Sequence, residues 1–141
     1  MRALALASAA VLLLAGCGGG DGDGGASGRQ GGPLIIEILE QNASGESGSA
    51  EMTPQNGRTD VLVQTGGVSG GIPNPNGVYK GTCAGVQGEP AYKLPDLQEG
   101  IGATTLDVSL DELLDGYVIA VLRSADDDTV IACGEIKEPE Q

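Results

Sequence analysis

Hydrophobic residues recur at every second position in several short segments, which is the period of a half-buried β-strand. The clearest is 103–110, in which Leu106, Val108 and Leu110 alternate with polar residues. Segment 117–124 ("YVIAVLRS") is apolar at successive positions and predicts a strand buried on both faces. Turn residues separate these segments, so we expect an all-β sandwich or barrel. The other expected strands are 34–40, 48–54, 58–65, 78–81 and 129–136.

One short helical turn interrupts this pattern at "SLDELLDG". Ser109 is placed to cap the turn, and Glu112 follows three residues later, as in a capping box. Gly116 can end the turn in a left-handed conformation. The leucines of this turn would cover one end of the sandwich: Leu110, Leu113 and Leu114.

Composition restricts both the core and the partners of this 141-residue chain, which is long enough for one domain. Phe and Trp are absent, so the core must consist mainly of Val, Ile, Leu and Ala. Acidic residues outnumber basic ones by 20 to 7, and the formal charge is −13. Nucleic acid binding requires clustered Lys and Arg, so we expect no nucleic acid partner. The same charge disfavours electrostatic docking on anionic lipid.

The N-terminal segment "MRALALASAAVLLLAGC" has the order of an export signal. Arg2 precedes an apolar run at 3–15, and these 13 residues fall short of the roughly 20 that a membrane-spanning helix needs. The run ends in "LLAGC", which resembles the lipobox of bacterial lipoprotein signal peptides. The resemblance implies that signal peptide 1–16 is removed, that Cys17 receives a diacylglyceryl group on sulfur, and that the new amino terminus is acylated.

A lipobox implies a lipid-anchored protein of the bacterial cell envelope. Gly18, rather than Asp, follows the lipidation site, which favours the outer membrane in a Gram-negative cell. Residues 17–32 would then form the lipidated cysteine and a flexible glycine-rich tether, because they contain no large apolar residue to bury. We expect a folded domain at 33–137 and a short tail at 138–141.

Two cysteines remain once Cys17 is assigned to lipid. Cys83 and Cys133 would both face an oxidising compartment, where a disulfide between them is expected. Closing a loop of about 50 residues would stabilise the fold by about 4 kcal/mol in the chain-entropy model. A reactive thiol or a metal ligand is the alternative, but neither cysteine is accompanied by histidine or by a CxxC pair.

Three consecutive carboxylates, Asp126, Asp127 and Asp128, lie between two apolar strands in "SADDDT". Aspartate is common in tight turns, so a hairpin loop explains them. They could also bind calcium weakly, although a dedicated calcium site takes six or more oxygen ligands.

The surroundings of the two remaining cysteines resemble a known family. "GTCAG" at 81–85, "VIACGEI" at 130–136 and the segment 103–124 are similar to the disulfide-bearing and intervening segments of the Cu,Zn superoxide dismutase superfamily, in particular its exported bacterial dismutase-like members. The similarity covers about 34–136. It implies an eight-stranded Greek-key sandwich or barrel in which a disulfide joins a loop to the last strand.

The chain departs from this family at every copper-ligand position that can be aligned. Gly77 and Tyr79 stand where the enzymes carry an H-x-H pair, and Leu122 replaces a further histidine ligand. The active-site arginine falls near Val130. Because the chain has no histidine, imidazole ligation and the dismutation that depends on it are excluded, and we expect no metal cofactor.

The sequence therefore predicts a lipid-anchored envelope protein with a non-catalytic, dismutase-like domain. Its role would be binding or structural, with an envelope protein as partner. Two alternatives stay open: a weak calcium-binding surface protein that uses Asp126, Asp127 and Asp128, and an enzyme that relies on carboxylates alone.

Overall fold

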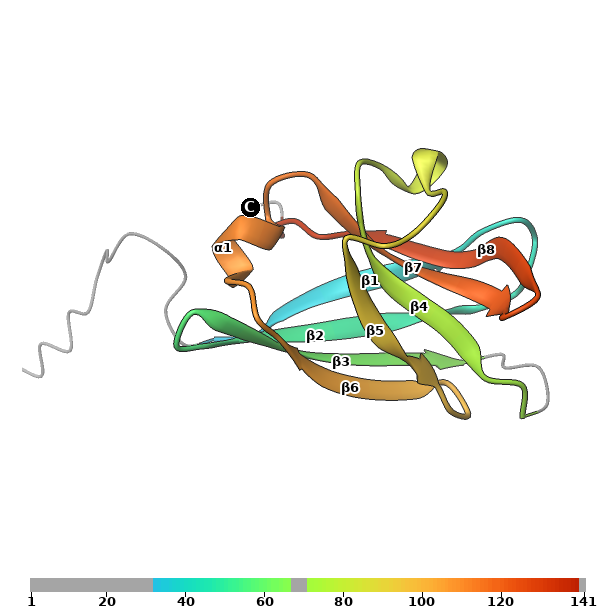
Figure 1. Cartoon of the computed structure of the whole chain (residues 1–141), viewed down its shortest axis with the longest axis horizontal. Helices are drawn as coiled ribbons and strands as arrows, with labels where there is room; N and C mark the ends of the chain where they lie inside the picture. The colour runs from blue at the N-terminus through green and yellow to red at the C-terminus, as the bar shows by residue number, and fades with distance from the viewer. Residues whose placement is uncertain (1–31, 67–70, 140–141) are drawn as a thin grey trace, which may run out of the picture.

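The computed structural model describes residues 32–66 and 71–139. Within these residues the chain is all-β, with eight antiparallel strands and two short helical turns (Figure 1). The strands are β1 (Leu34–Glu40), β2 (Ser47–Gln55), β3 (Arg58–Gly66), β4 (Asn74–Lys80), β5 (Tyr92–Leu97), β6 (Ile101–Leu106), β7 (Tyr117–Ser124) and β8 (Asp127–Glu135). The helical turns are η1 (Cys83–Gly85) and α1 (Leu110–Leu113).

The strands form one nearly closed, barrel-like sheet in the order β5-β4-β7-β8-β1-β2-β3-β6. The two end strands, β5 and β6, follow one another in the chain and are joined by a tight turn. In this turn the N–H of Gln98 donates to the carbonyl of Ile101 at 3.0 Å, and the reverse bond measures 3.1 Å. The sheet thus curls round until its first and last strands meet at this turn, which leaves little free edge.

Strand β1 joins the two halves of the sheet. Its first part, 34–38, pairs with β2, whereas Leu39 and Glu40 pair with Cys133 and Ala132 of β8. Close approach of β8 to β1 requires a glycine, because a β-carbon on Gly134 would lie 2.4 Å from the carbonyl oxygen of Glu37. Gly134 thus allows the backbones of β8 and β1 to approach closely where β1 passes from one strand partner to the other.

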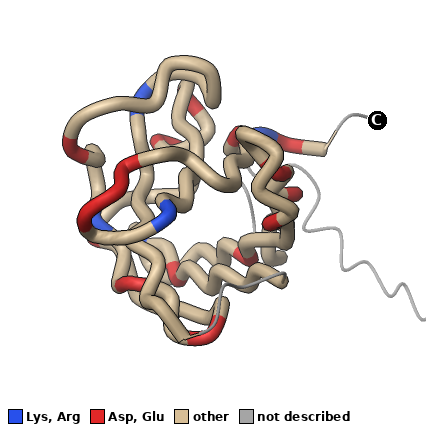
Figure 2. Tube along the Cα trace, turned by 90° about the vertical axis from the view of Figure 1, so that its right-hand side faces the viewer, with Lys and Arg blue, Asp and Glu red and all other residues tan. Residues whose placement is uncertain are grey.

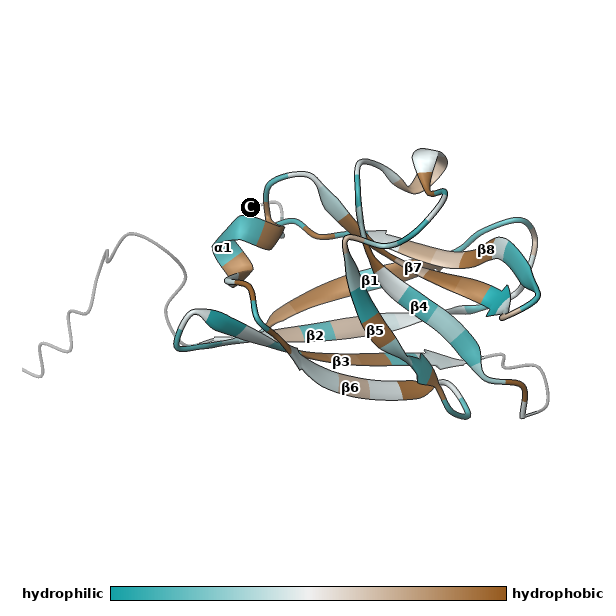
Figure 3. Cartoon of the chain, viewed as in Figure 1, coloured by the Kyte–Doolittle hydropathy of each residue, from teal (hydrophilic) through white to brown (hydrophobic). Residues whose placement is uncertain are grey.

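Alternate residues in the central parts of β1, β2 and β3 are buried, as in half-buried strands. Figure 3 shows the change between hydrophobic and hydrophilic positions along the strands. All eight strands and α1 contribute to the resulting inner core, which is aliphatic apart from Met52 and half-buried tyrosines at its margin. Thr59 is fully buried among these residues, and its hydroxyl donates to the carbonyl of Val108 at 2.8 Å, so the core contains no unpaired hydroxyl there.

The expected capping of the helical turn is confirmed. The N–H of Glu112 donates to the hydroxyl of Ser109 at 3.2 Å, and Gly116 follows the turn with a φ of +85°. The turn closes one end of the barrel (Figure 1), where its leucines are buried or pack against the core, as predicted: Leu110, Leu113 and Leu114.

The strand predictions were wrong in two places. Strand β4 begins at Asn74, not at 78, because Asn74 and Asn76 are buried and hydrogen-bond to backbone carbonyls of neighbouring segments instead of forming a surface turn. Strand β5 was missed altogether, because Pro95 interrupts its short apolar pattern. Proline is tolerated there because β5 lies at the end of the hydrogen-bonded order.

Other strand boundaries differ from the predicted ones by a few residues. Strand β6 ends at Leu106, although Val108 and Leu110 still point inward as expected. Strand β8 begins at Asp127, two residues before the predicted start, because the turn that precedes it is tighter than expected.

Candidate functional site

A small cavity on the outside of the barrel brings together residues from separate parts of the sequence analysis. Its volume is about 170 Å³. Tyr79 and Leu122, two of the positions that the resemblance aligns with copper ligands, line it together with Asp128 from the acidic hairpin. The segment after η1 completes the wall with Val86, Gln87 and Gly88.

Tyr79 is held in place by a second apolar group that lies outside the barrel, called the outer cluster here. The outer cluster consists of Tyr79, Val118, Ala120 and Cys133, with the partly buried Cys83, Val86 and Val130 packed against them. In β4, Val78 points inward and Tyr79 outward, and Tyr79 pairs with Val118 of β7. The outward face of these strands is therefore apolar as well, which explains why β7 is buried on both faces.

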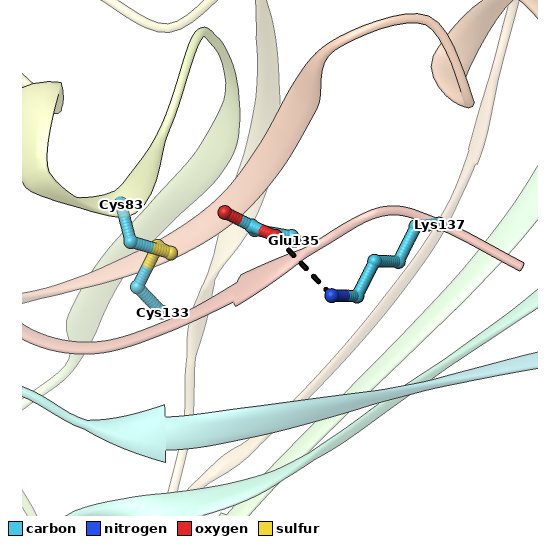
Figure 4. The surroundings of a disulfide bond; sticks show 4 residues. All are labelled: Cys83, Cys133, Glu135 and Lys137. Atoms are coloured by element: carbon cyan, nitrogen blue, oxygen red, sulfur yellow. Dashed lines mark ion pairs between the residues drawn. A yellow bond between two sulfur atoms is a disulfide. The ribbon is translucent and has the colours of Figure 1, made fainter. Parts of the chain in front are cut away.

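The predicted disulfide between Cys83 and Cys133 is confirmed, with a Cα–Cα distance of 5.8 Å (Figure 4). It ties the loop that carries η1 to strand β8. Because Val86 is only three residues beyond Cys83, the same link holds the loop wall of the cavity over Tyr79. Exposed charges flank the link: Lys137 Nζ lies 3.4 Å from Glu135 Oε2.

Tyr79 is almost entirely buried as a residue, with 5% of its surface exposed. Its hydroxyl is not among the buried polar atoms that lack a hydrogen-bond partner in the described part of the chain, which are Glu46 Oε1, Thr65 Oγ1, Asn74 Oδ1 and Asn76 Oδ1. Burial raises the pKa of Tyr79, and the nearby carboxylate of Asp128 raises it further. The phenol therefore stays neutral at physiological pH.

The three acidic residues of the hairpin have different surroundings. Asp127 accepts hydrogen bonds from the hydroxyl of Thr129 at 2.6 Å and from its N–H at 3.0 Å, and these bonds lower the pKa of Asp127. Its other oxygen lies 3.9 Å from Arg123. Asp128 lines the cavity instead, and Asp126 is exposed in the turn. Between 32 and 139, leaving out 67–70, no three acidic or cysteine side chains are grouped so that they could hold a metal ion.

Gly77 is buried in β4, and the space that a side chain would need is already filled. A β-carbon at this position would lie 2.5 Å from Cβ of Pro90 and 3.2 Å from the carbonyl oxygen of Tyr92. Pro90 therefore occupies the place of any ligand that could project from position 77. Sequence reasoning found Gly77 but missed Pro90, whose only signal was its position in the shortened loop after Cys83.

A larger groove of about 460 Å³ runs along the junction of β1 and β8. It is lined by Ile35 and Leu39, both more than half exposed, and by both disulfide cysteines. Apart from these cysteines, it contains none of the residues that the sequence singled out. The smaller cavity brings together three residues that the sequence singled out, Tyr79, Leu122 and Asp128, so it is the stronger candidate site.

Surface charge follows the composition. Figure 2 shows acidic positions around the whole described fold and only a few basic ones. Lys80 is one of the few, and its ammonium lies 4.7 Å from the ring centre of Tyr117. No lysine or arginine is among the residues that line the cavity at Tyr79, so its only formal charge is the carboxylate of Asp128.

Cys17 and the expected signal peptide and tether lie outside the described residues. Within the described part of the chain, no helix has the length and apolar character needed to cross a membrane. Comparisons with known proteins match the chain to no family model, no curated protein and no solved structure.

Proposed function

We propose that the protein is a lipid-anchored component of the bacterial cell envelope whose dismutase-like domain is non-catalytic and serves in binding. The strand order supports the fold part of this proposal. Strands β4, β5 and β6 follow one another around the barrel, and β7 returns to lie beside β4, which is the Greek-key arrangement. A disulfide from the loop after β4 to the last strand also agrees with the resemblance to the dismutase superfamily.

The observation that carries the non-catalytic part is the replacement of all three aligned copper-ligand positions. Tyr79 and Leu122 meet in one cavity, but they supply a phenol and an alkyl group. At Gly77, Pro90 fills the space of a side chain. A redox copper site needs nitrogen or sulfur ligands in open coordination, and these residues do not supply them.

Metal content and turnover test this part of the proposal. The purified full-length protein is incubated with copper and zinc, dialysed, and analysed for bound metal and for superoxide-dependent activity, beside a Cu,Zn superoxide dismutase treated in the same way. We expect no stoichiometric metal and no turnover. Copper that survives dialysis together with superoxide turnover would refute the proposal.

The envelope location rests on the "LLAGC" sequence that ends at Cys17. Labelling with radioactive palmitate in a bacterial host tests it, with Cys17→Ser as the matched variant. We expect label in the wild-type protein only, and its recovery in the membrane fraction. Equal labelling of both proteins, or of neither, would contradict lipid anchoring.

A further inference from the structure

Four buried oxygen atoms within the described residues have no hydrogen-bond partner: Glu46 Oε1, Thr65 Oγ1, Asn74 Oδ1 and Asn76 Oδ1. Glu46 is only 3% exposed, and Asn74 only 1%. No lysine or arginine in the described ranges forms an ion pair with Glu46. Buried polar groups are normally paired, and a buried charge is normally matched by an opposite charge or by a metal ion. These oxygens therefore point to a ligand that carries positive charge.

Three of the four residues lie at the same end of the barrel, opposite α1 (Figure 1). Glu46 comes directly before β2, Thr65 is next to last in β3, and Asn74 begins β4. The pairs β2–β3, β3–β6 and β4–β5 are antiparallel, and β5 and β6 are joined by a tight turn. The starts of β2 and β4 and the end of β3 therefore share one rim of the barrel.

Each of these three side chains continues the inward-facing row of its strand, which alternates with outward-facing positions. Val63 and Asn76, one step deeper in β3 and β4, line the same narrow pocket. The inward faces of β3 and β4 thus meet inside the barrel. The next inward residues of the three strands belong to the inner core: Ala50 and Met52 in β2, Val61 and Val63 in β3, and Val78 in β4.

The turn between β5 and β6 holds Thr65 and Asn74 on either side of it. The N–H of Thr65 donates to the carbonyl of Gly100 at 2.8 Å. Asn74 pairs with Leu97, which lies three residues before Gly100 in the same turn. Because both side chains face inward from this turn, their free oxygens lie at the same level of the barrel.

Glu46 approaches Thr65 from the neighbouring strand. Thr65 pairs with Gly48, and Glu46 is the next residue on the same face of the sheet. Such diagonal neighbours are about 7–8 Å apart, within reach of a long side chain. Gly48 has no side chain to stand between them, so the carboxylate of Glu46 can extend towards the hydroxyl of Thr65.

The amide of Asn74 has a fixed orientation. Its Nδ2 donates to the carbonyl of Leu122 at 3.2 Å and to that of Arg123 at 2.9 Å. Turning the amide over would place Oδ1 against two carbonyl oxygens, so Oδ1 is the atom left free. A carboxylate, an amide oxygen and a hydroxyl oxygen are thus available at this rim, whereas the amide hydrogens of Asn74 are already used.

We propose that this end of the barrel binds a calcium ion through the side chains of Glu46, Thr65 and Asn74. Calcium takes about six to eight oxygen ligands at roughly 2.3–2.6 Å, from carboxylates, carbonyls and water. Only Glu46 is acidic, so no acidic run marks the site in the sequence, and water completes the shell. With one charged ligand we expect a dissociation constant of about 10⁻⁴–10⁻³ M, as in extracellular calcium modules. The site is separate from the acidic hairpin and does not depend on the proposed function.

The melting temperature of the purified full-length protein, treated with a chelator and dialysed, tests the proposal. Calcium, magnesium and sodium chloride are titrated separately, with choline chloride holding the ionic strength constant. We expect calcium to raise the melting temperature saturably, by about 5 °C or more at about 10 mM, because it binds the folded state only. If calcium has no more effect than choline, water alone satisfies these oxygens and the proposal is overturned.

Glu46→Gln removes the charge and keeps the size of the side chain. It should weaken calcium binding by about tenfold or more. In the chelator-treated protein it should instead raise the melting temperature, because it removes an unpaired buried charge. Glu51→Gln, the same change at an exposed position of β2, should do neither. Thr65→Val, which removes only the hydroxyl, should weaken calcium binding several-fold.

Binding of calcium by the acidic hairpin is the competing explanation. In that case Asp126→Asn or Asp128→Asn would weaken binding and Glu46→Gln would not, which would overturn the assignment to the barrel end. A fall in melting temperature for Glu46→Gln that is the same with and without calcium would also overturn it, since that is the result of a purely structural role. Neither result bears on the copper and superoxide test of the proposed function.

Discussion

Strand β7 separates two apolar regions that are built in different ways. On one face, Ile119 and Val121 belong to the inner core, to which all eight strands contribute. On the other face, Val118 and Ala120 belong to the outer cluster, which has four buried members in the described part of the chain. The inner core is enclosed by the hydrogen-bonded barrel, whereas the outer cluster is covered by a loop that a disulfide holds in place.

The inner core accounts for the fold, whereas the outer cluster carries the candidate binding cavity. The inner core follows from the alternation of aliphatic residues, and neither disulfide cysteine belongs to it. The outer cluster is too small to order a long loop by burial alone, since each ordered residue costs about 1–2 kcal/mol of conformational entropy. The candidate cavity lies on the outer cluster, so its shape depends on the disulfide more than on the barrel.

Removing the disulfide should have the largest effect. The double variant Cys83→Ser, Cys133→Ser removes a cross-link between residues that are 50 positions apart in the chain. We expect the free energy of unfolding to fall by about 4 kcal/mol. Urea denaturation of the variant and of the reduced wild-type protein should give the same loss. Exchange of backbone amides should rise first at 86–88, before it rises in β1–β3. Uniform loss of protection across the barrel would show that the two regions are not separable.

A pair of valines on the same strand compares the two regions directly. Val121→Ala in the inner core and Val118→Ala in the outer cluster remove the same atoms from positions that are at most 1% exposed. With the disulfide intact, each should cost about 2–3 kcal/mol in urea denaturation. In the reduced protein, the cost of Val118→Ala should shrink, because the loop that covers it can open, and that of Val121→Ala should persist. If Val118→Ala costs as much in the reduced protein as in the oxidised one, the outer cluster is ordered without its cross-link.

Gly77 tests how firmly the loop is packed on the barrel. Gly77→Ala places a methyl group against Pro90 and should cost about 1–2 kcal/mol, because the loop must shift to accommodate it. Gly85→Ala is the matched control, since its nearest neighbour would be Thr82 Oγ1 at 3.7 Å. Adding Pro90→Ala should recover part of the loss. A neutral Gly77→Ala would indicate that Pro90 yields easily, and that position 77 is open to larger side chains.

The sequence predicted the inner core better than the outer surface. Period-two alternation located β3 and β6, and a continuous apolar run located β7, because the inward residues of these strands share one simple requirement, which is burial. The sequence did not predict strand β5 or the start of β4, because distant segments set their environment. For example, the side-chain amide of the buried Asn76 donates to the carbonyl of Pro95 at 2.5 Å. Propensity favours a turn for "NPNG", and tertiary contacts override it.

The candidate site was only partly predictable for the same reason. The resemblance singled out Tyr79 and Leu122, and the acidic run singled out Asp128, but nothing in the sequence says that these three meet. Their meeting depends on the register of β4 with β7 and of β7 with β8. Gln87 and Gly88 had no local signal, since their role follows from the loop path that Cys83 fixes.

The smallest effect is expected at the hairpin, which belongs to neither apolar region. Hydrogen bonds from Thr129 lower the pKa of Asp127 below the ordinary value of an aspartate, so the folded state favours the ionised carboxylate. The resulting stabilisation is present above about pH 3.8, and it is lost as the pH falls through the lower, folded-state pKa. Asp127→Asn should therefore lower the melting temperature slightly at pH 6, and the difference from wild type should shrink towards pH 3. Asp126→Asn, a charge change of equal size in the same turn, should show no such pH dependence. If both variants follow the same pH profile, the effect comes from net charge and not from the bonds that Thr129 donates.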